Sequence, residues 1–204
     1  DELIRHAITK LSHIHFVSNE DAKKRLIQMG ESDKCIFVIG SPDIDVMYSD
    51  ELPSISEVKS HYDIRFDKYA TFIFHPVTTE IQTLEHQIRE VVTALIESKK
   101  NYVVIYPNND SGSDIILKEY EQLKNMNNFK VLPSVRFEYF LTLLKESKLL
   151  IGNSSAGIKE SEVYGIPTIN IGTRQKNRTK SGNIINVASS KIHILDAMTQ
   201  VENK

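Results

Sequence analysis

Short apolar runs alternate along this chain with longer segments in which apolar residues recur every three to four positions. The runs have the length of strands and the periodic segments have the length of helices. A strand that is followed by a helix and then by another strand favours parallel pairing, because the helix returns the chain to the starting edge of the sheet. The alternation therefore predicts an α/β fold, with a mainly parallel sheet between two layers of helices.

The predicted elements cover most of the sequence. Strands are expected at residues 13–17, 35–39, 69–74, 102–106, 129–132, 149–151, 168–171 and 184–187. Helices are expected at residues 1–12, 19–29, 44–47, 56–62, 79–99, 114–124, 137–146, 155–163 and 192–200, and the long helix 79–99 is expected to be capped by Thr78 or Thr79. Residues 50–68 are mostly polar, and we expect them to form a surface connection.

The composition excludes several classes of protein. The 204 residues suffice for one α/β domain, and 40% hydrophobic with 25% charged residues is ordinary for a soluble globular protein. The formal net charge of −2 argues against polyanion binding, so we expect no nucleic-acid partner. No apolar run approaches the ~18 residues of a membrane span and no signal-peptide pattern is present, so we expect a cytoplasmic protein without a membrane partner.

The single cysteine, Cys35, lies in an apolar run, which predicts a buried thiol on a strand. One cysteine forms no intrachain disulfide, and the chain lacks the Cys/His spacing that is typical of a metal site. We therefore expect the chemistry of this protein to use neither a metal nor a cofactor.

A turn rich in small residues separates the strand at 149–151 from the helix that follows. Asn153, Ser154 and Ser155 are all good N-cap residues. At the carboxyl end of a parallel strand such a turn directs backbone N–H groups and hydroxyls to the positive end of a helix dipole, which suits a phosphate group. Glu160 follows a little over one turn later, where it can accept hydrogen bonds from a sugar or ribose hydroxyl. An equally weighted alternative is a capped helix with a solvated glutamate.

Other polar residues follow the carboxyl ends of neighbouring strands, which open on the same crevice in a parallel sheet. His75, Asn108 and Arg174 each follow such a strand. Near a diphosphate we expect His75 to stay protonated, and to donate a hydrogen bond or act as a general acid. Arg174 is suited to hold phosphate oxygens through two parallel hydrogen bonds.

Each of these residues also has an ordinary explanation. A lone histidine is commonly packed or solvated, Asn108, Asp110 and Ser113 are typical turn residues, and the basic loop 172–178 can be a solvated charged loop. Their combination at one edge favours a nucleotide diphosphate. The chain has no P-loop and no Gly-x-Gly-x-x-Gly turn, and Ser155 lacks the Gly-x-Ser-x-Gly elbow of a Ser-His-Asp hydrolase.

These residues lie in stretches that resemble the hydrolysing UDP-N-acetylglucosamine 2-epimerases of sialic acid synthesis, both the bacterial enzymes and the epimerase part of the bifunctional animal enzyme. The stretches are short, but they keep their order over most of the chain and are specific together. They are Ile4-Arg5-His6-Ala7-Ile8-Thr9-Lys10-Leu11, His75-Pro76-Val77-Thr78-Thr79, Pro107-Asn108 with Asp110 and Gly112-Ser113, Gly152-Asn153-Ser154-Ser155 with Gly157 and Glu160, and Gly172-Thr173-Arg174-Gln175 with Arg178.

The resemblance implies a two-domain enzyme of the GT-B type with a UDP-sugar in the cleft between the domains. Residues 1–204 would form its carboxyl-terminal, UDP-binding Rossmann-like domain, a three-layer sandwich, and residues 1–12 would form the helix between the domains. The sequence begins inside a helical pattern without an initiator methionine, so we expect a fragment or one domain of two. The implied partners are the UDP-sugar, the amino-terminal domain of the same enzyme, and further copies in a homo-oligomer.

The resemblance also assigns UDP-binding roles to residues at several strand ends. Two serines and an arginine hold the diphosphate, a glutamate holds the ribose hydroxyls, a loop contacts the uracil base, and an asparagine lines the nucleotide. In that order these residues are Ser154, Ser155 and Arg174; Glu160; Val135 and Phe137 of the loop 134–137; and Asn108.

The family's reaction removes the proton at C2 of the sugar, eliminates UDP to give a glycal, and adds water to yield N-acetylmannosamine. The implied catalytic residues are His75, near the diphosphate and the reacting sugar, and Glu2, where the family carries an acidic residue. Most of the carboxylates that move protons at the sugar are expected in the amino-terminal half. These 204 residues alone are therefore expected to bind UDP weakly and not to turn over.

Four alternatives to this function stay open. A related hydrolysing epimerase acts on a UDP-2,4-diacetamido-2,4,6-trideoxy sugar in legionaminic acid synthesis, and a non-hydrolysing epimerase keeps UDP on its product. A GT-B glycosyltransferase would transfer the sugar to a second substrate, and a UDP-binding module would catalyse nothing. The residues at 153–155 and 172–175 favour the hydrolysing branch over the non-hydrolysing one.

Overall fold

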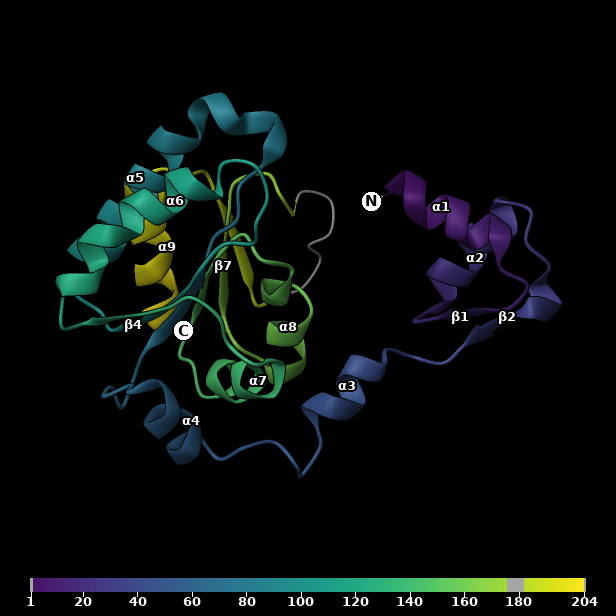
Figure 1. Cartoon of the computed structure of the whole chain (residues 1–204), viewed down its shortest axis with the longest axis horizontal. Helices are drawn as coiled ribbons and strands as arrows, with labels where there is room; N and C mark the ends of the chain where they lie inside the picture. Colours follow the sequence, from purple (N-terminus) through teal and green to yellow (C-terminus); the bar gives the residue numbers. More distant parts are fainter. Residues whose placement is uncertain (1, 176–181, 204) are drawn as a thin grey trace. The chain divides into compact units, whose positions relative to one another are not determined.

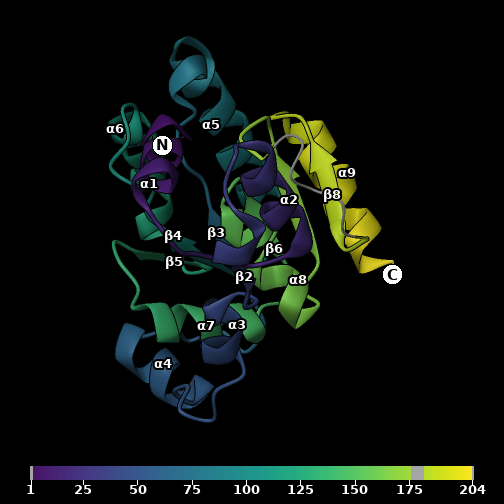
Figure 2. The same cartoon turned by 90° about the vertical axis from the view of Figure 1, so that its right-hand side faces the viewer.

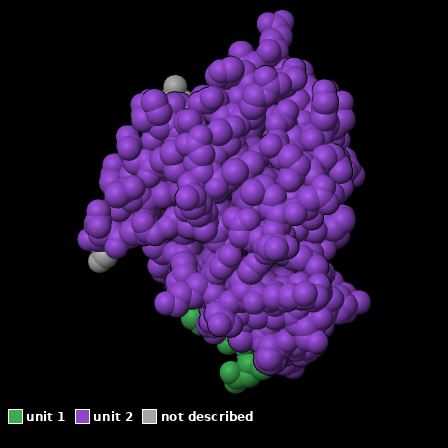
Figure 3. All heavy atoms as spheres, turned by 90° about the vertical axis from the view of Figure 1, so that its left-hand side faces the viewer, with its two compact units in different colours: residues 1–50 green, residues 51–204 purple. Residues whose placement is uncertain are grey.

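The protein consists of two compact units, residues 1–50 (unit 1) and residues 51–204 (unit 2), coloured separately in Figure 3. A computed structural model describes residues 2–175 and 182–203. Unit 1 holds a two-stranded sheet and unit 2 a six-stranded sheet. None of the helices in the described ranges has the length and hydrophobicity that crossing a bilayer requires.

The sheet of unit 2 is parallel throughout and has the strand order β5-β4-β3-β6-β7-β8. From β3 the chain builds outward to β5 at one edge and then returns to place β6, β7 and β8 on the other side (Figure 2). The switch point, where the strand order reverses, therefore lies between β3 and β6. The strands are β3 (Ala70–Ile73), β4 (Tyr102–Ile105), β5 (Phe129–Leu132), β6 (Leu150–Gly152), β7 (Thr168–Ile171) and β8 (Ile184–Val187).

Helices cover both faces of this sheet (Figure 1). One face packs against α5 (Ile81–Glu97), α6 (Ser113–Tyr120) and α9 (Lys191–Glu202), and the other packs against α4 (Ile55–Tyr62), α7 (Phe137–Lys145) and α8 (Glu160–Tyr164). The 3₁₀ turns of unit 2 are η2 (Thr78–Glu80), η3 (Glu121–Asn125) and η4 (Ser155–Gly157). The predicted α/β three-layer fold is therefore confirmed for the part of the chain that carries the candidate site.

Alternation along the strands explains why the sheet has two apolar faces. Phe72 and Phe74 point into the core beneath α5, α6 and α9, whereas Ile73 and the neighbouring Tyr69 point to the opposite side. Successive strand residues face opposite sides, and each fully buried large apolar side chain contributes about 1.5–3 kcal/mol. A central strand with apolar residues on both faces is stable only between two helical layers.

Unit 1 contains two parallel strands and three α-helices. Its elements are α1 (Glu2–Leu11), β1 (His15–Val17), α2 (Glu20–Gln28), η1 (Asp33–Cys35), β2 (Ile36–Val38) and α3 (Pro42–Met47). Helix α2 is capped by Asn19, whose side chain accepts a hydrogen bond from the backbone N–H of Ala22 at 2.9 Å. Much of the apolar surface is exposed, including that of Leu3, Ile4, Ile8, Leu11, Ile14, Phe16, Phe37, Val38 and Ile39.

The expectation for residues 50–68 was wrong. They do not form a mere surface connection, because α4 covers one face of the six-stranded sheet. Val58 and Ile64 are buried there in a cluster with Val103 and Leu143. The sequence did not indicate that these two side chains are buried, because polar residues surround both of them. Their burial depends on where the sheet lies in the fold.

Local geometry corrects three further expectations. Cys35 lies in the turn η1 and is half-buried, so it is not a buried thiol on a strand. The long helix α5 is not capped by Thr78 or Thr79, because the turn η2 precedes it and Glu80 occupies the cap position. The helix expected at 155–163 is split into the turn η4 and a short α8, because the chain passes tightly against β7 at Gly157.

Gly152 ends β6 under a strict steric limit. Its φ of +135° lies in a region that side chains rarely adopt, and a Cβ atom there would stand 1.8 Å from the carbonyl oxygen of Ile73 on β3. The main chains of β3 and β6 therefore approach each other more closely than any residue except glycine permits.

Replacing Gly152 with alanine should destabilise the protein by about 3 kcal/mol or more, because the methyl group has to displace the backbone of a central strand. Urea unfolding measures this loss. Gly182→Ala is the matched control, since no atom of residues 2–175 and 184–203 lies within 4 Å of the added methyl group there, and it should change stability by less than about 0.5 kcal/mol. Equal midpoints for the two variants would contradict the steric argument.

Candidate functional site

The candidate site lies at the carboxyl end of the sheet, where β3 and β6 meet at the switch point. His75 follows β3 and Asn153 follows β6. The backbone N–H of His75 donates to Asn153 Oδ1 at 2.7 Å, and Asn153 Nδ2 donates to the carbonyl oxygen of His75 at 2.8 Å. Ligands of open α/β sheets bind in the crevice at such a point, so these two residues lie at the expected place.

The His75 ring is held by the end of the next strand. The backbone N–H of Asn108, after β4, donates to His75 Nδ1 at 3.0 Å. A nitrogen that accepts this bond carries no proton, so the neutral ring is protonated at Nε2. Burial and the nearby charge of Arg174 lower the pKa of His75 from 6.5 to about 4, and Asp110 opposes this shift. His75 is therefore neutral at pH 7, and the expectation of a protonated ring beside a bound diphosphate stays a prediction.

The loop after β7 closes the other side of the cluster. Arg174 Nη1 donates to the carbonyl oxygen of Asn153 at 3.3 Å, and Gln175 Nε2 donates to the same oxygen at 3.0 Å. Thr173 donates to the carboxylate of Glu80 in the turn η2. The loop is thereby fastened to β3 and β6, and the predicted Arg174 lies beside the predicted His75. The neighbouring positions 176–181 of the basic loop lie outside the described residues.

The small-residue turn after β6 is polar, as predicted, but the α-helix that follows it starts later and is shorter than expected. Ser154 Oγ accepts a hydrogen bond from the backbone N–H of Ala156 at 3.3 Å, so Ser154 caps the turn η4. Ser155 is exposed. The α-helix proper begins only at Glu160 and spans five residues. Any phosphate bound here would therefore depend on the side chains and the turn more than on a long helix dipole.

Three buried oxygen atoms near this edge lack hydrogen-bond partners among the described residues. They are Asn108 Oδ1, Glu160 Oε2 and Gln175 Oε1. Most buried polar atoms in native proteins are paired, so unpaired ones at a crevice indicate a missing ligand or ordered water. Gln175 is 1% exposed, and the sequence analysis placed it in a motif without assigning it to the site. Its type gave no signal, since glutamine is an ordinary loop residue.

The loop expected to contact a base follows β5. Val135 is half-buried and packs against the cluster that contains Tyr62 and Tyr139, whereas the Phe137 side chain at the start of α7 is 42% exposed. The backbone N–H of Arg136 donates to the hydroxyl of Tyr62 at 3.2 Å. With Val135 packed inward, the exposed side chains of this loop are those of Ser134, Arg136 and Phe137.

The structure brings several of the predicted residues together in one cluster. Val135, Phe137 and Glu2 are not part of that cluster. His75, Asn108 and Arg174 form one cluster beside the turn of Ser154 and Ser155. Val135 and Phe137 lie at the end of β5, two strands from β3 and therefore about 10 Å along the edge of the sheet. Glu2 belongs to helix α1 of unit 1, and its side chain lies outside the described part of the structure.

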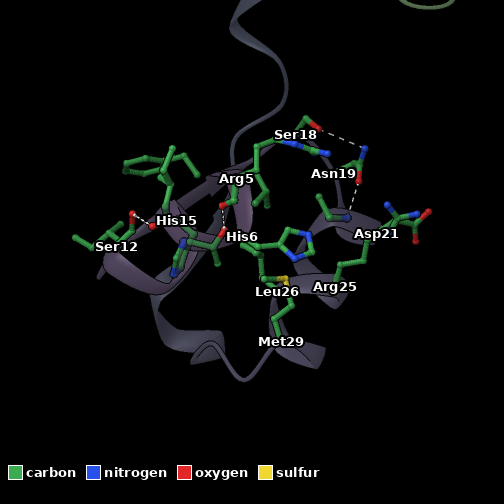
Figure 4. Close-up of a pocket in the computed structure, with 16 residues that line it drawn as sticks. Arg5, His6, Ser12, His15, Ser18, Asn19, Asp21, Arg25, Leu26 and Met29 are labelled. Carbon is green, nitrogen blue, oxygen red and sulfur yellow. Dashed lines mark hydrogen bonds between the residues drawn. The ribbon is translucent and has the colours of Figure 1, made fainter. Parts of the chain in front are cut away.

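Unit 1 has a pocket of its own, with a volume of about 810 Å³. Figure 4 shows Arg5 and His6 of α1 and Arg25 of α2 among the side chains that line it. Apolar residues such as Ile14 and Phe16 complete the lining. Within residues 2–175 and 182–203, no three His, Cys, Asp or Glu side chains are grouped so that they could hold a metal ion.

The sequence matches known proteins along its whole length. The profile of the family described as UDP-N-acetylglucosamine 2-epimerase matches residues 1–204. A protein of Neisseria meningitidis serogroup B, named UDP-N-acetylglucosamine 2-epimerase, is 49% identical over 98% of the chain and 53% of its own length. The Escherichia coli polysialic acid biosynthesis protein P7 is 38% identical over 94% of the chain and 49% of its own length. The chain therefore spans about half the length of these curated relatives.

Solved structures share the fold. A UDP-GlcNAc 2-epimerase of Neisseria meningitidis, bound to UDP-GlcNAc, superposes with a TM-score of 0.72 at 20% identity, over 96% of this chain and 54% of that one. The UDP-GlcNAc 2-epimerase of Methanocaldococcus jannaschii superposes with a TM-score of 0.71 at 20% identity, over 96% of this chain and 57% of that one.

The buried, neutral His75 should make the protein less stable as the pH falls from about 6.5 to about 4. The unfolded chain binds a proton at the ordinary pKa of 6.5, and the folded chain binds it only near 4. The free energy of unfolding should therefore decrease by about 3 kcal/mol across this window, and this contribution should be complete above it. Urea unfolding at a series of pH values measures the slope.

His75→Asn is the control for this prediction, because its side-chain oxygen can accept the same bond from Asn108 and does not titrate. The wild-type profile minus the variant profile isolates the contribution of His75. Parallel profiles between pH 7 and pH 4 would show that His75 is solvated rather than buried.

Proposed function

Because the chain belongs to the UDP-N-acetylglucosamine 2-epimerase family, we propose that it supplies the UDP-binding half of a hydrolysing UDP-N-acetylglucosamine 2-epimerase of sialic acid synthesis. The enzyme would convert UDP-N-acetylglucosamine and water to N-acetylmannosamine and UDP. The observation that carries this proposal is the cluster at the switch point, where His75, Arg174 and unpaired buried oxygens converge on one edge of a parallel sheet.

The diphosphate of this ligand would bind to Arg174 and to the turn of Ser154 and Ser155. Arg174 is half-buried, and its guanidinium lies close enough to His75 to lower the pKa of the ring. A charge held in a partly buried position binds a phosphate more strongly than the same charge in solvent, because water screens it less. Ser155 has an exposed position from which its hydroxyl can donate to a phosphate oxygen.

The nucleoside would extend from the diphosphate along the sheet edge. Glu160 Oε2 is buried and has no hydrogen-bond partner among the described residues, which costs folding free energy. A ribose hydroxyl that donates to this oxygen would remove that cost. Asn108 offers a second unpaired oxygen to the nucleotide. The main chain around Val135 and the exposed ring of Phe137 provide the donor, acceptor and stacking surface that a pyrimidine requires.

His75 would act where the sugar leaves the diphosphate. In the elimination, the bond between C1 and the diphosphate oxygen breaks, a base removes the C2 proton, and a C1–C2 double bond forms. His75 Nε2 carries the proton of the neutral ring and can donate a hydrogen bond to the departing oxygen. A bound diphosphate would also raise the pKa of the ring and oppose the effect of Arg174. The catalytic role of Glu2 remains part of the proposal.

The amino-terminal half of the same enzyme is the partner that this function requires. Unit 1 exposes a large apolar surface, with Leu3, Leu11 and Phe16 all more than 60% exposed. A parallel pair of strands is normally buried on both faces, so this surface supports contact with the rest of a longer chain. We further propose that unit 2 is the UDP-binding domain, that α1 connects the domains, and that the enzyme is a cytoplasmic homo-oligomer.

A second candidate function keeps the reaction and changes the sugar. A Legionella pneumophila protein named UDP-N,N'-diacetylbacillosamine 2-epimerase (hydrolyzing) is 32% identical to this chain. The residues proposed here are assigned to the nucleotide and not to C4 or C6 of the sugar, so the same half-site would serve either substrate. The higher identity of the Neisseria meningitidis relative, 49%, favours UDP-N-acetylglucosamine.

Arg174→Ala and Ser155→Ala should each weaken UDP binding by about 1–3 kcal/mol, because each variant removes a charge-assisted hydrogen bond to the diphosphate. Calorimetry with UDP, UMP and uridine measures this, and both variants should lose most of the preference for UDP over uridine. Ser18→Ala in unit 1 is the control for a lost surface hydroxyl. Unchanged UDP affinity in both variants would remove the basis for the phosphate assignment.

Product analysis on the full-length protein tests the reaction. The substrate is UDP-N-acetylglucosamine with deuterium at C2. We expect free N-acetylmannosamine and UDP in equal amounts, and exchange of the deuterium with solvent. His75→Asn should lower kcat by more than it raises the dissociation constant of UDP, since it acts on the departing oxygen. Release of UDP-N-acetylmannosamine would identify the non-hydrolysing reaction, and turnover only with an added acceptor would identify a glycosyltransferase.

A further inference from the structure

The hydrogen-bond ladder between β3 and β6 stops one residue before the site. Its last register pair joins Ile73 and Gly152, and the backbone N–H of Asn153 still donates to the carbonyl oxygen of Ile73 at 3.1 Å. Beyond Gly152 the main chain turns away into η4. The carboxyl end of β3, with His75, therefore loses its main-chain partner at the point where the crevice begins.

The side chain of Asn153 replaces the missing main chain. Its amide accepts from the N–H of His75 and donates to the carbonyl of His75, at 2.7 and 2.8 Å, as a peptide group of a paired strand would do. Asn153 is 1% exposed, so these bonds have little competition from water. The amide adds one more rung to the ladder and fixes the backbone of His75.

The main-chain carbonyl of Asn153 serves the opposite side of the crevice. It accepts hydrogen bonds from Arg174 Nη1 at 3.3 Å and from Gln175 Nε2 at 3.0 Å. One residue thus contacts the residues that follow β3 and β7, and it directly follows β6, the strand between them. Because Gly152 locks the main chain just before it, the direction of this carbonyl has little freedom.

We propose that Asn153 is a positioning residue, which holds His75 and Arg174 at a set separation across the switch point. The identity of the ligand in this inference rests on the proposed function. The positioning of His75 and Arg174 rests only on the hydrogen bonds of Asn153. Asn153 touches neither the diphosphate nor the sugar in this arrangement, since its amide and its carbonyl are already engaged by the protein.

Only a primary amide on a short side chain satisfies both groups of His75. An aspartate accepts from the N–H and repels the carbonyl, a serine is too short to reach both, and a leucine leaves both unpaired. A buried backbone group without a partner costs about 1–3 kcal/mol, so each replacement would move the backbone of His75 toward another partner. The imidazole and its contact with the N–H of Asn108 would move with it.

The groups that face the His75 ring are known from the structure. Arg174 from the loop after β7 opposes a positive charge on the ring, and Asp110 from the loop after β4 favours one. Burial is the largest effect. Releasing the backbone of His75 should expose the ring and separate it from Arg174, and both changes move its pKa upward from about 4 toward 6.5.

The test compares Asn153→Ser with a matched control in the full-length protein. Asn101→Ser is suitable, because Asn101 Nδ2 also donates to a backbone carbonyl beside β3, that of Lys68. This bond lies at the amino-terminal end of the strand, away from the site. The ring protons of His75 are followed by NMR from pH 4 to pH 8. In Asn153→Ser the His75 titration should move up by at least one pH unit, and in Asn101→Ser it should stay where it is.

Turnover gives a second readout through a double-mutant cycle. Asn153→Ser should lower kcat at least tenfold in the wild type and less than threefold when His75 is already asparagine, because the side chain of Asn153 acts through His75, whereas its main-chain carbonyl still accepts from Arg174. Asn153→Ala, which leaves both backbone groups of His75 unpaired and adds no charge beside the ring, replaces the serine variant if the latter does not fold, with the same NMR criterion.

An unchanged His75 titration in a folded Asn153 variant would overturn the proposal, and so would an equal loss of kcat with His75 and with asparagine at that position. The failure of the proposed function gives a different result. If the wild type binds no UDP, that function falls, while the His75 titration still decides whether Asn153 positions the ring.

Discussion

The site depends on the close approach of β3 and β6. At Gly152 the two main chains are so near that no side chain fits between them, and from this contact β6 leaves the sheet. The ladder is completed by a side chain instead, that of Asn153, and the freed main chain forms the turn of Ser154 and Ser155. A tight strand pair at the switch point therefore creates the crevice, supplies its polar turn and fixes the histidine at its edge. The hydrogen bonds from Asn108, Arg174 and Gln175 are made to the two residues that this arrangement holds in place, His75 and Asn153.

Electrostatics follow from the same geometry. The N–H of Asn108 holds the His75 ring in a partly buried position near Arg174, and both burial and the positive charge keep the ring neutral. The cluster contains the positive charge of Arg174 and a neutral histidine, together with the carboxylates of Asp110 and Glu160 and the amide oxygens of Asn108 and Gln175. In the proposed function the arginine takes the diphosphate and the unpaired oxygens accept hydrogen bonds from the hydroxyl groups of the nucleotide.

The two units of the chain differ in how completely they bury their apolar residues. Unit 2 has helices on both faces of a six-stranded sheet, and its core residues are fully enclosed. Unit 1 has a two-stranded sheet whose apolar residues are largely exposed, which agrees with a chain that spans about half the length of its relatives. The residues proposed to bind the diphosphate lie in unit 2. Glu2, which is proposed as a catalytic residue, belongs to unit 1.

Local patterns in the sequence were enough to predict the alternation of strands and helices, the strand bounds 129–132 and 168–171, and the strand ends that carry His75, Asn108, Ser154 and Arg174. Such features depend on periodicity, on turn residues and on the shared edge of a parallel sheet. The tertiary structure alone decided the neutral state of His75, the bridging bonds of Asn153, the burial of Gln175 and the split of the chain into two units. The side-chain contacts behind these properties join residues from 21 positions apart, as in Arg174 and Asn153, to 99 positions apart, as in His75 and Arg174, and no local pattern records which distant groups will meet.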